Sequence, residues 1–142
     1  MNVVDANVLL YAVNQHAEQH HIALRWLNRA LSGASTVGFP WISVIAFTRI
    51  ATSRSLLAQP LTIDTAVDQI ELWLSSPAAT IVEPTRRHLS LVQSLLAPLR
   101  IGGNIVNDAH LAALSIEHRG SVVSFDTDFA LFGGITWHRP TL

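Results

Sequence analysis

Short apolar runs alternate with longer stretches of helical spacing along the whole chain. The apolar runs predict strands at residues 2–5, 36–39, 80–82, 121–125 and 135–137. The helical spacing predicts helices at 7–13, 16–31, 40–52, 62–76, 85–96 and 107–118. Pro40 suits a first helical turn, and Thr62, Thr85 and Asn107 suit helix caps. This alternation predicts βαβ units, and therefore an α/β fold with a parallel sheet and right-handed crossovers.

Four of the six aspartates stand where such a sheet binds ligands. Asp5 ends a predicted strand, Asp126 follows one, Asp128 lies two residues further on, and Asp108 opens a predicted helix. Ligands of parallel sheets bind outside the carboxyl ends of the strands. Taken singly, each aspartate is also typical of a helix cap or a turn. Together they predict converging carboxylates, which repel each other unless a cation neutralises them, so a divalent-metal site is the first hypothesis.

Composition narrows the possible chemistry. The 142 residues are 49% apolar, which predicts a single domain over residues 1–142 with a full core. The absence of cysteine excludes disulfides, zinc–thiolate sites and cysteine nucleophiles, and the absence of lysine excludes Schiff-base and P-loop chemistry. No apolar run is long enough for a bilayer and no basic leader is visible, so we expect a cytoplasmic protein with no membrane partner.

Three segments carry a family resemblance: VDANVLLY at residues 4–11, NDAHLAAL at 107–114 and DTDF at 126–129. In order and separation they resemble the PIN-domain family, and within it the ribonuclease toxins of VapC-type toxin–antitoxin pairs, over essentially the whole chain. The resemblance implies a three-layer α/β/α domain with a mainly parallel sheet. It also implies dependence on Mg²⁺ or Mn²⁺ and endonucleolytic cleavage of RNA. A cognate antitoxin is expected to wrap the toxin, in a homodimer, heterotetramer or larger assembly.

The resemblance also assigns roles to the acids. Asp5 and Asp108 would hold the first ion, and Asp126 would complete its coordination or hold a second one. Asp128 would be an outer ligand or orient water, and Asn7 would hydrogen-bond one of the carboxylates. The family usually supplies a glutamate from the helix after the second strand, but here Ala46 stands in its place. The number of ions is therefore left open.

The helix predicted at 40–52 is apolar on nearly all sides between residues 42 and 50, which indicates contact with a partner helix or a second copy. Arg49 and Arg54 lie on or just after it and are candidates for RNA phosphate contacts, although surface ion pairing fits them equally well.

Other interpretations remain open. Because Ala46 replaces an acid, a PIN-like module that binds RNA or protein without cutting is the main alternative. A phosphoaspartyl phosphatase is disfavoured, since Asn7 stands where its second aspartate belongs and no lysine is present. His16 and His20 have the spacing of a zinc pair on one helix, but we interpret them as a polar helix face. We expect Glu117 to be solvated.

Overall fold

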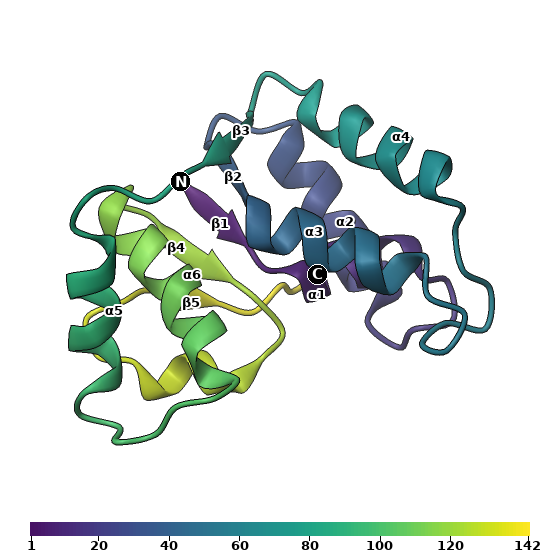
Figure 1. The fold of residues 1–142 in the computed structure, drawn as a ribbon. Helices are drawn as coiled ribbons and strands as arrows, with labels where there is room; N and C mark the ends of the chain where they lie inside the picture. The colour runs from purple at the N-terminus through teal and green to yellow at the C-terminus, as the bar shows by residue number, and fades with distance from the viewer.

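A computed structural model describes residues 1–142 and contains one five-stranded sheet (Figure 1). The strands are β1 (Asn2–Val4), β2 (Val37–Pro40), β3 (Ala79–Val82), β4 (Ser121–Val123) and β5 (Trp137–His138). Their order is β3-β2-β1-β4-β5, and all neighbouring pairs are parallel. The carboxyl ends of all five strands therefore lie at one edge of the sheet, which is where a ligand site is expected.

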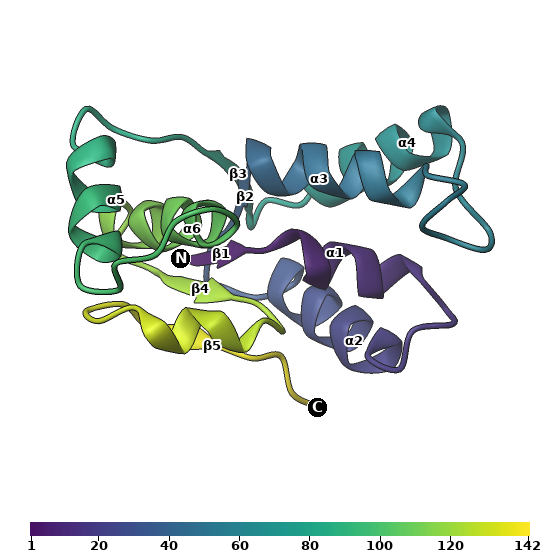
Figure 2. The ribbon, with the colours of Figure 1, turned by 60° about the horizontal axis from the view of Figure 1, so that its bottom comes forward.

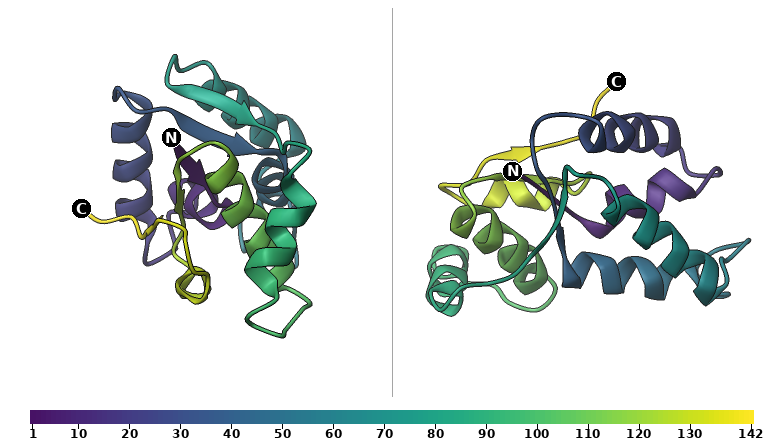
Figure 3. Two further views of the ribbon diagram at one scale, coloured as in Figure 1. Left: turned by 90° about the vertical axis from the view of Figure 1, so that its left-hand side faces the viewer. Right: turned by 90° about the horizontal axis from the view of Figure 1, so that it is seen from above.

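Helices pack on both sides of the strands. They are α1 (Ala6–Val13), α2 (His20–Leu31), α3 (Trp41–Ala51), α4 (Ile63–Leu74), α5 (His88–Leu96), α6 (Ile105–Glu117) and the 3-10 helix η1 (Thr127–Leu131). Figure 2 shows α1–α4 gathered on one side and α5, α6 and η1 on the other, and α5 lies along α6 in every view (Figure 3).

Successive strand residues point to opposite cores. Val4 and Val123 pack with α1–α4, whereas Val3 and Val122 pack with α5, α6 and η1. This alternation follows from the two-residue period of a strand, and all four valines are at most 1% exposed. The predicted α/β/α architecture with a parallel sheet is confirmed. No helix is both long and apolar enough to cross a membrane.

Three helices, α2, α5 and α6, begin two or more residues away from their predicted starts. α2 starts at His20 because residues 14–19 form turns, in which the His16 N–H donates to the Asn14 side chain at 3.1 Å. His16 and His20 therefore do not share a helix, so the interpretation of the pair as one polar helix face is wrong, and the helical spacing of a zinc pair is absent. His20 Nδ1 lies 2.8 Å from the Tyr11 carbonyl oxygen. The cap predicted at Thr62 is confirmed by its bond from the Thr65 N–H at 3.1 Å.

The starts of α5 and α6 also differ from the prediction. α5 begins at His88, so Thr85 is not its cap. α6 begins at Ile105, directly after a turn in which Gly103 has φ of +76°, so Asn107 lies inside the helix. This earlier start leaves Asp108 in the first helical turn, as expected.

Candidate metal centre

Two of the aspartates end neighbouring strands. Asp5 follows β1 and caps α1, accepting the Ala6 N–H at 2.7 Å. Asp126 follows β4 and caps η1, accepting the Asp128 N–H at 2.9 Å. Because β1 and β4 pair in parallel, both carboxylates reach the same edge of the sheet.

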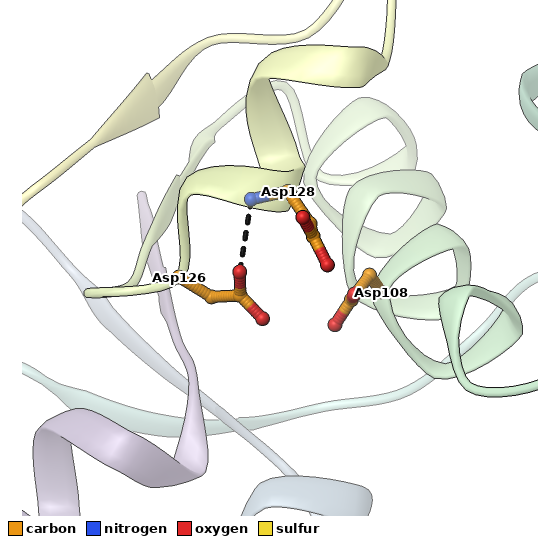
Figure 4. A group of neighbouring side chains, drawn as sticks. All are labelled: Asp108, Asp126 and Asp128. Carbon is orange, nitrogen blue, oxygen red and sulfur yellow. Dashed lines mark hydrogen bonds between the residues drawn. The ribbon is translucent and has the colours of Figure 1, made fainter.

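A third carboxylate comes from α6, whose N-terminal turn faces that edge. Figure 4 shows Asp108 directed from α6 towards Asp126 and Asp128. One oxygen from each of these three carboxylates lies within 4.8 Å of the others. The structure thus brings together acids from two of the three sequence motifs, with only oxygen atoms as possible ligands.

Asp5 is held in place beside this cluster by a small hydrogen-bond network. Its Oδ2 accepts from the Ser124 hydroxyl at 2.6 Å and from the Asn7 amide at 3.1 Å. The Ser124 hydroxyl also accepts from Asn7 at 2.9 Å and from the Asp126 N–H at 3.0 Å. Ser124 is fully buried and was not singled out from the sequence, where its only signal is a polar residue between an apolar strand and Phe125–Asp126.

Burial and, to a lesser extent, mutual repulsion disfavour the charged form of these carboxylates. Burial raises the pKa of Asp108 to about 7, with further contributions from Asp126, Asp5 and Asp128 in that order. Burial also raises the pKa of Asp5; hydrogen bonds from Ser124 and Ala6 oppose this, and the charge of Asp126 adds to it. A cation placed among these groups would remove the repulsion.

Comparison with known proteins decides the family. A family model described as the PIN domain matches residues 3–135. Ribonuclease VapC37 of Mycobacterium tuberculosis is 51% identical over 140 residues, which cover 99% of this chain and 97% of the relative. The chain belongs to the PIN-domain family. The resemblance inferred from the three sequence motifs is therefore confirmed.

Solved structures show the same PIN fold. VapBC2 of Rickettsia felis, bound to a DNA fragment from its promoter, superposes with a TM-score of 0.70 at 16% identity, covering 99% of this chain and 98% of the other. VapC20 of Mycobacterium tuberculosis, a sarcin–ricin loop cleaving toxin, gives 0.67 at 19% identity, covering 99% of this chain and all of the other (100%).

Ala46, which the family resemblance aligns with the usual glutamate, is part of an apolar wall beside the carboxylates. Ala46 lines a cavity of about 130 Å³ that also contains Asp5 and Asp108. Ile42 on α3 and Leu111 on α6 complete its apolar side. The α3 helix therefore presents no carboxylate to the cluster, whose acids come from the ends of β1 and β4 and from α6.

The two arginines proposed as RNA contacts lie on α3 and just after it. Arg49 is exposed and follows Ala46 by one turn along α3. Arg54 lies in the turn after α3 and is also exposed. Neither forms an ion pair, since the one pair within 4.0 Å in the structure joins His88 and Glu117. Their contact with RNA stays a prediction.

The prediction of a solvated Glu117 is wrong. Its side chain is only 1% exposed, accepts from the Thr85 hydroxyl and, at 3.0 Å, from the Thr85 N–H, and pairs with His88 Nδ1 at 2.8 Å. His88 Nε2 in turn meets His110 Nδ1 at 2.6 Å. This network joins α5 to α6.

Proposed function

We propose that this PIN-domain protein is a divalent-metal-dependent endoribonuclease toxin that hydrolyses RNA phosphodiester bonds. The convergence of Asp108, Asp126 and Asp128 beside a fixed Asp5 is the observation that carries the proposal. Such a cluster can hold the cation that metal-assisted hydrolysis of a phosphodiester uses. The name of the relative VapC37, which is 51% identical over nearly the whole chain, supports RNA as the substrate.

The donor set fits a hard cation. The three clustered side chains offer carboxylate oxygen only, which Mg²⁺ and Mn²⁺ prefer. Burial raises the pKa of Asp108, and the charges of Asp126, Asp5 and Asp128 add to this rise; a bound cation would favour the charged carboxylate. We infer that Asp108, Asp126 and Asp128 hold Mg²⁺ or Mn²⁺, with Asp5 contributing directly or through water.

The mechanism follows from how the chain places these groups. When bound, the cation makes water more acidic and offsets negative charge on the phosphate. Ser124 and Asn7 hold the Asp5 carboxylate in a single orientation. Ile42 and Ala46 give the site an apolar side. Arg49, one turn further along α3, is our candidate for a contact with an RNA phosphate.

We further propose that a cognate antitoxin neutralises the toxin and that the chain forms a homodimer, alone or within a heterotetramer or larger assembly. Apolar exposure on α3 supports a protein partner, since Trp41 is 51% and Ile45 61% exposed. Because the proposed substrate is RNA, we place the activity in the cytoplasm.

The proposal is tested by cleavage of a structured RNA in Mn²⁺. The wild-type chain should cut, whereas Asp5→Asn and Asp108→Asn should reduce the rate at least about 100-fold, because each removes a carboxylate charge from the centre. Glu71→Gln, an exposed change on α4, is the matched control. Equal cleavage by Asp108→Asn and wild type would disprove a metal nuclease.

Because Ala46 is not an acid, one alternative function remains, which is a PIN module that binds RNA without cutting it. The α3 helix lacks an acid at the wall of the cavity, so the centre has one carboxylate fewer than is usual in the family. Under this alternative the wild-type chain binds the RNA, and Mn²⁺ produces no cleavage products.

A further inference from the structure

Arg139 lies at the same sheet edge as the carboxylates, although nothing in the sequence analysis marked it. It follows β5 directly, and β5 pairs in parallel with β4. The Ser124 N–H donates to the His138 carbonyl at 3.1 Å. Arg139 therefore stands beside the segment that leads into Asp126, and in Figure 2 the C-terminal segment leaves β5 and continues past this edge towards α2.

The Arg139 guanidinium rests on an aromatic side chain. Its Cζ lies 5.7 Å from the centre of the Phe125 ring, at a distance typical of a cation–π contact. Tyr11 meets the same ring edge-on, with ring centres 5.2 Å apart and planes at 77°. Phe125 is only 9% exposed, so it is a fixed support, and it immediately precedes Asp126.

The guanidinium is free to bind a ligand. Arg139 is exposed and has neither an ion pair nor a hydrogen bond to another protein group. Stacking on Phe125 restricts the side chain while leaving its N–H groups unused. A planar guanidinium held in this way is suited to bind phosphate through two parallel hydrogen bonds.

The order of the strands places positive charge on both sides of the acids. Asp5 and Asp126 follow the adjacent central strands β1 and β4. Arg49 belongs to the helix after β2 on one side, and Arg139 follows β5 on the other. Neighbouring strands are about 4.8 Å apart, so the backbone at the end of β5 lies about one strand spacing from the end of β4, the strand that leads to Asp126. A nucleic-acid strand along this edge would meet arginine, carboxylates and arginine in turn.

We propose that Arg139, supported by Phe125, binds an RNA phosphate next to the scissile one and so positions the substrate strand. This role rests on the proposed ribonuclease function and adds a contact on the β5 side of the site. Arg139 is a positioning residue, because it touches a phosphate that does not react.

Binding of a fluorescent single-stranded RNA, measured by anisotropy over a range of salt concentrations, tests the proposal. All variants carry Asp108→Asn, so that the RNA is bound and not cut. Arg139→Gln should weaken binding about three- to tenfold and should reduce the slope of log affinity against log salt by about 0.7, the value for one phosphate contact. Arg139→Lys keeps the charge and should retain the slope, with weaker affinity than arginine.

The control is Arg119→Asn, which removes a charge from the opposite, amino edge of the sheet just before β4. Asparagine tolerates the φ of +53° at this position, and affinity and slope should match those of the parent. In the cleaving chain, Arg139→Gln should raise KM with kcat within about twofold. Unchanged slope and KM in Arg139→Gln would overturn the role of Arg139, even if wild type still cleaves. No RNA cleavage by wild type would instead refute the function on which it rests.

Discussion

Replacing Asp108 by asparagine should stabilise the metal-free protein. Burial and three neighbouring acids raise the pKa of Asp108 from 3.8 to about 7, so its charged form is disfavoured in the fold. Without solvent screening, a pKa raised this far would correspond to about 4 kcal/mol of folding free energy lost when Asp108 is charged. Solvent screening at this half-exposed side chain reduces the gain to about 1–2 kcal/mol. Loss of a favourable helix-dipole contact subtracts a few tenths of a kcal/mol.

The gain should depend on pH in a defined direction. Because the pKa of Asp108 is raised by folding, its stabilising contribution is present below about pH 4 and is lost as the pH rises towards 7. The difference between Asp108→Asn and wild type should therefore be largest near pH 8 and should vanish near pH 4.

Urea unfolding in EDTA, followed by tryptophan fluorescence, measures this difference directly. Glu71→Gln, an exposed charge on α4, should change the free energy of unfolding by no more than about 0.5 kcal/mol. Added Mn²⁺ should stabilise wild type and not Asp108→Asn, because only the native cluster binds the ion. If Asp108→Asn is no more stable than wild type in EDTA at pH 8, burial and the neighbouring acids do not destabilise the charged form of Asp108 in the fold.

Three further changes test the supports of the site and the fold. Ser124→Ala removes a buried hydroxyl that holds Asp5 in place. It should lower the free energy of unfolding, measured with urea, by about 1–3 kcal/mol and should slow RNA cleavage. Glu117→Gln should lower the free energy of unfolding at pH 7 by about the same 1–3 kcal/mol. Because hydrogen bonds from Thr85 and His88 outweigh burial and lower the pKa of Glu117, its contribution is present above pH 4.5 and should disappear on further acidification. Ala46→Glu adds a carboxylate to the cavity wall and should raise the number of Mn²⁺ ions in calorimetry by one; an unchanged number would contradict a limiting role for Ala46.

The sequence pattern predicted the strands and helices because apolar residues repeat at the spacing of each element wherever one of its faces packs against a core. It failed at the start of α5, where a distant partner decides. Thr85 has the side chain of a good cap, but Glu117, 32 residues away, accepts its hydroxyl, and α5 begins only at His88. The same contact explains why Glu117, on a helix end that reads as polar surface, is buried.

The carboxylates were predictable because one rule places the ends of parallel strands together. Their supports were not, since these depend on which strands become neighbours. Ser124 meets Asp5 across 119 residues of sequence, through the pairing of β1 with β4. Arg139 gains its place beside Phe125 through the pairing of β4 with β5. Neither pairing has a local signal in the chain.

The distribution of charge in the fold follows one principle, which is that opposite charges stay apart around the site. The one ion pair in the structure, between His88 and Glu117, joins α5 to α6. No arginine neutralises Asp5, Asp108 or Asp126, although a guanidinium among them would relieve their repulsion. Such a pairing would stabilise the apo fold and would occupy both the oxygens needed by a cation and the donors needed by a phosphate. The repulsion at the centre is therefore the energetic cost of keeping both partners available.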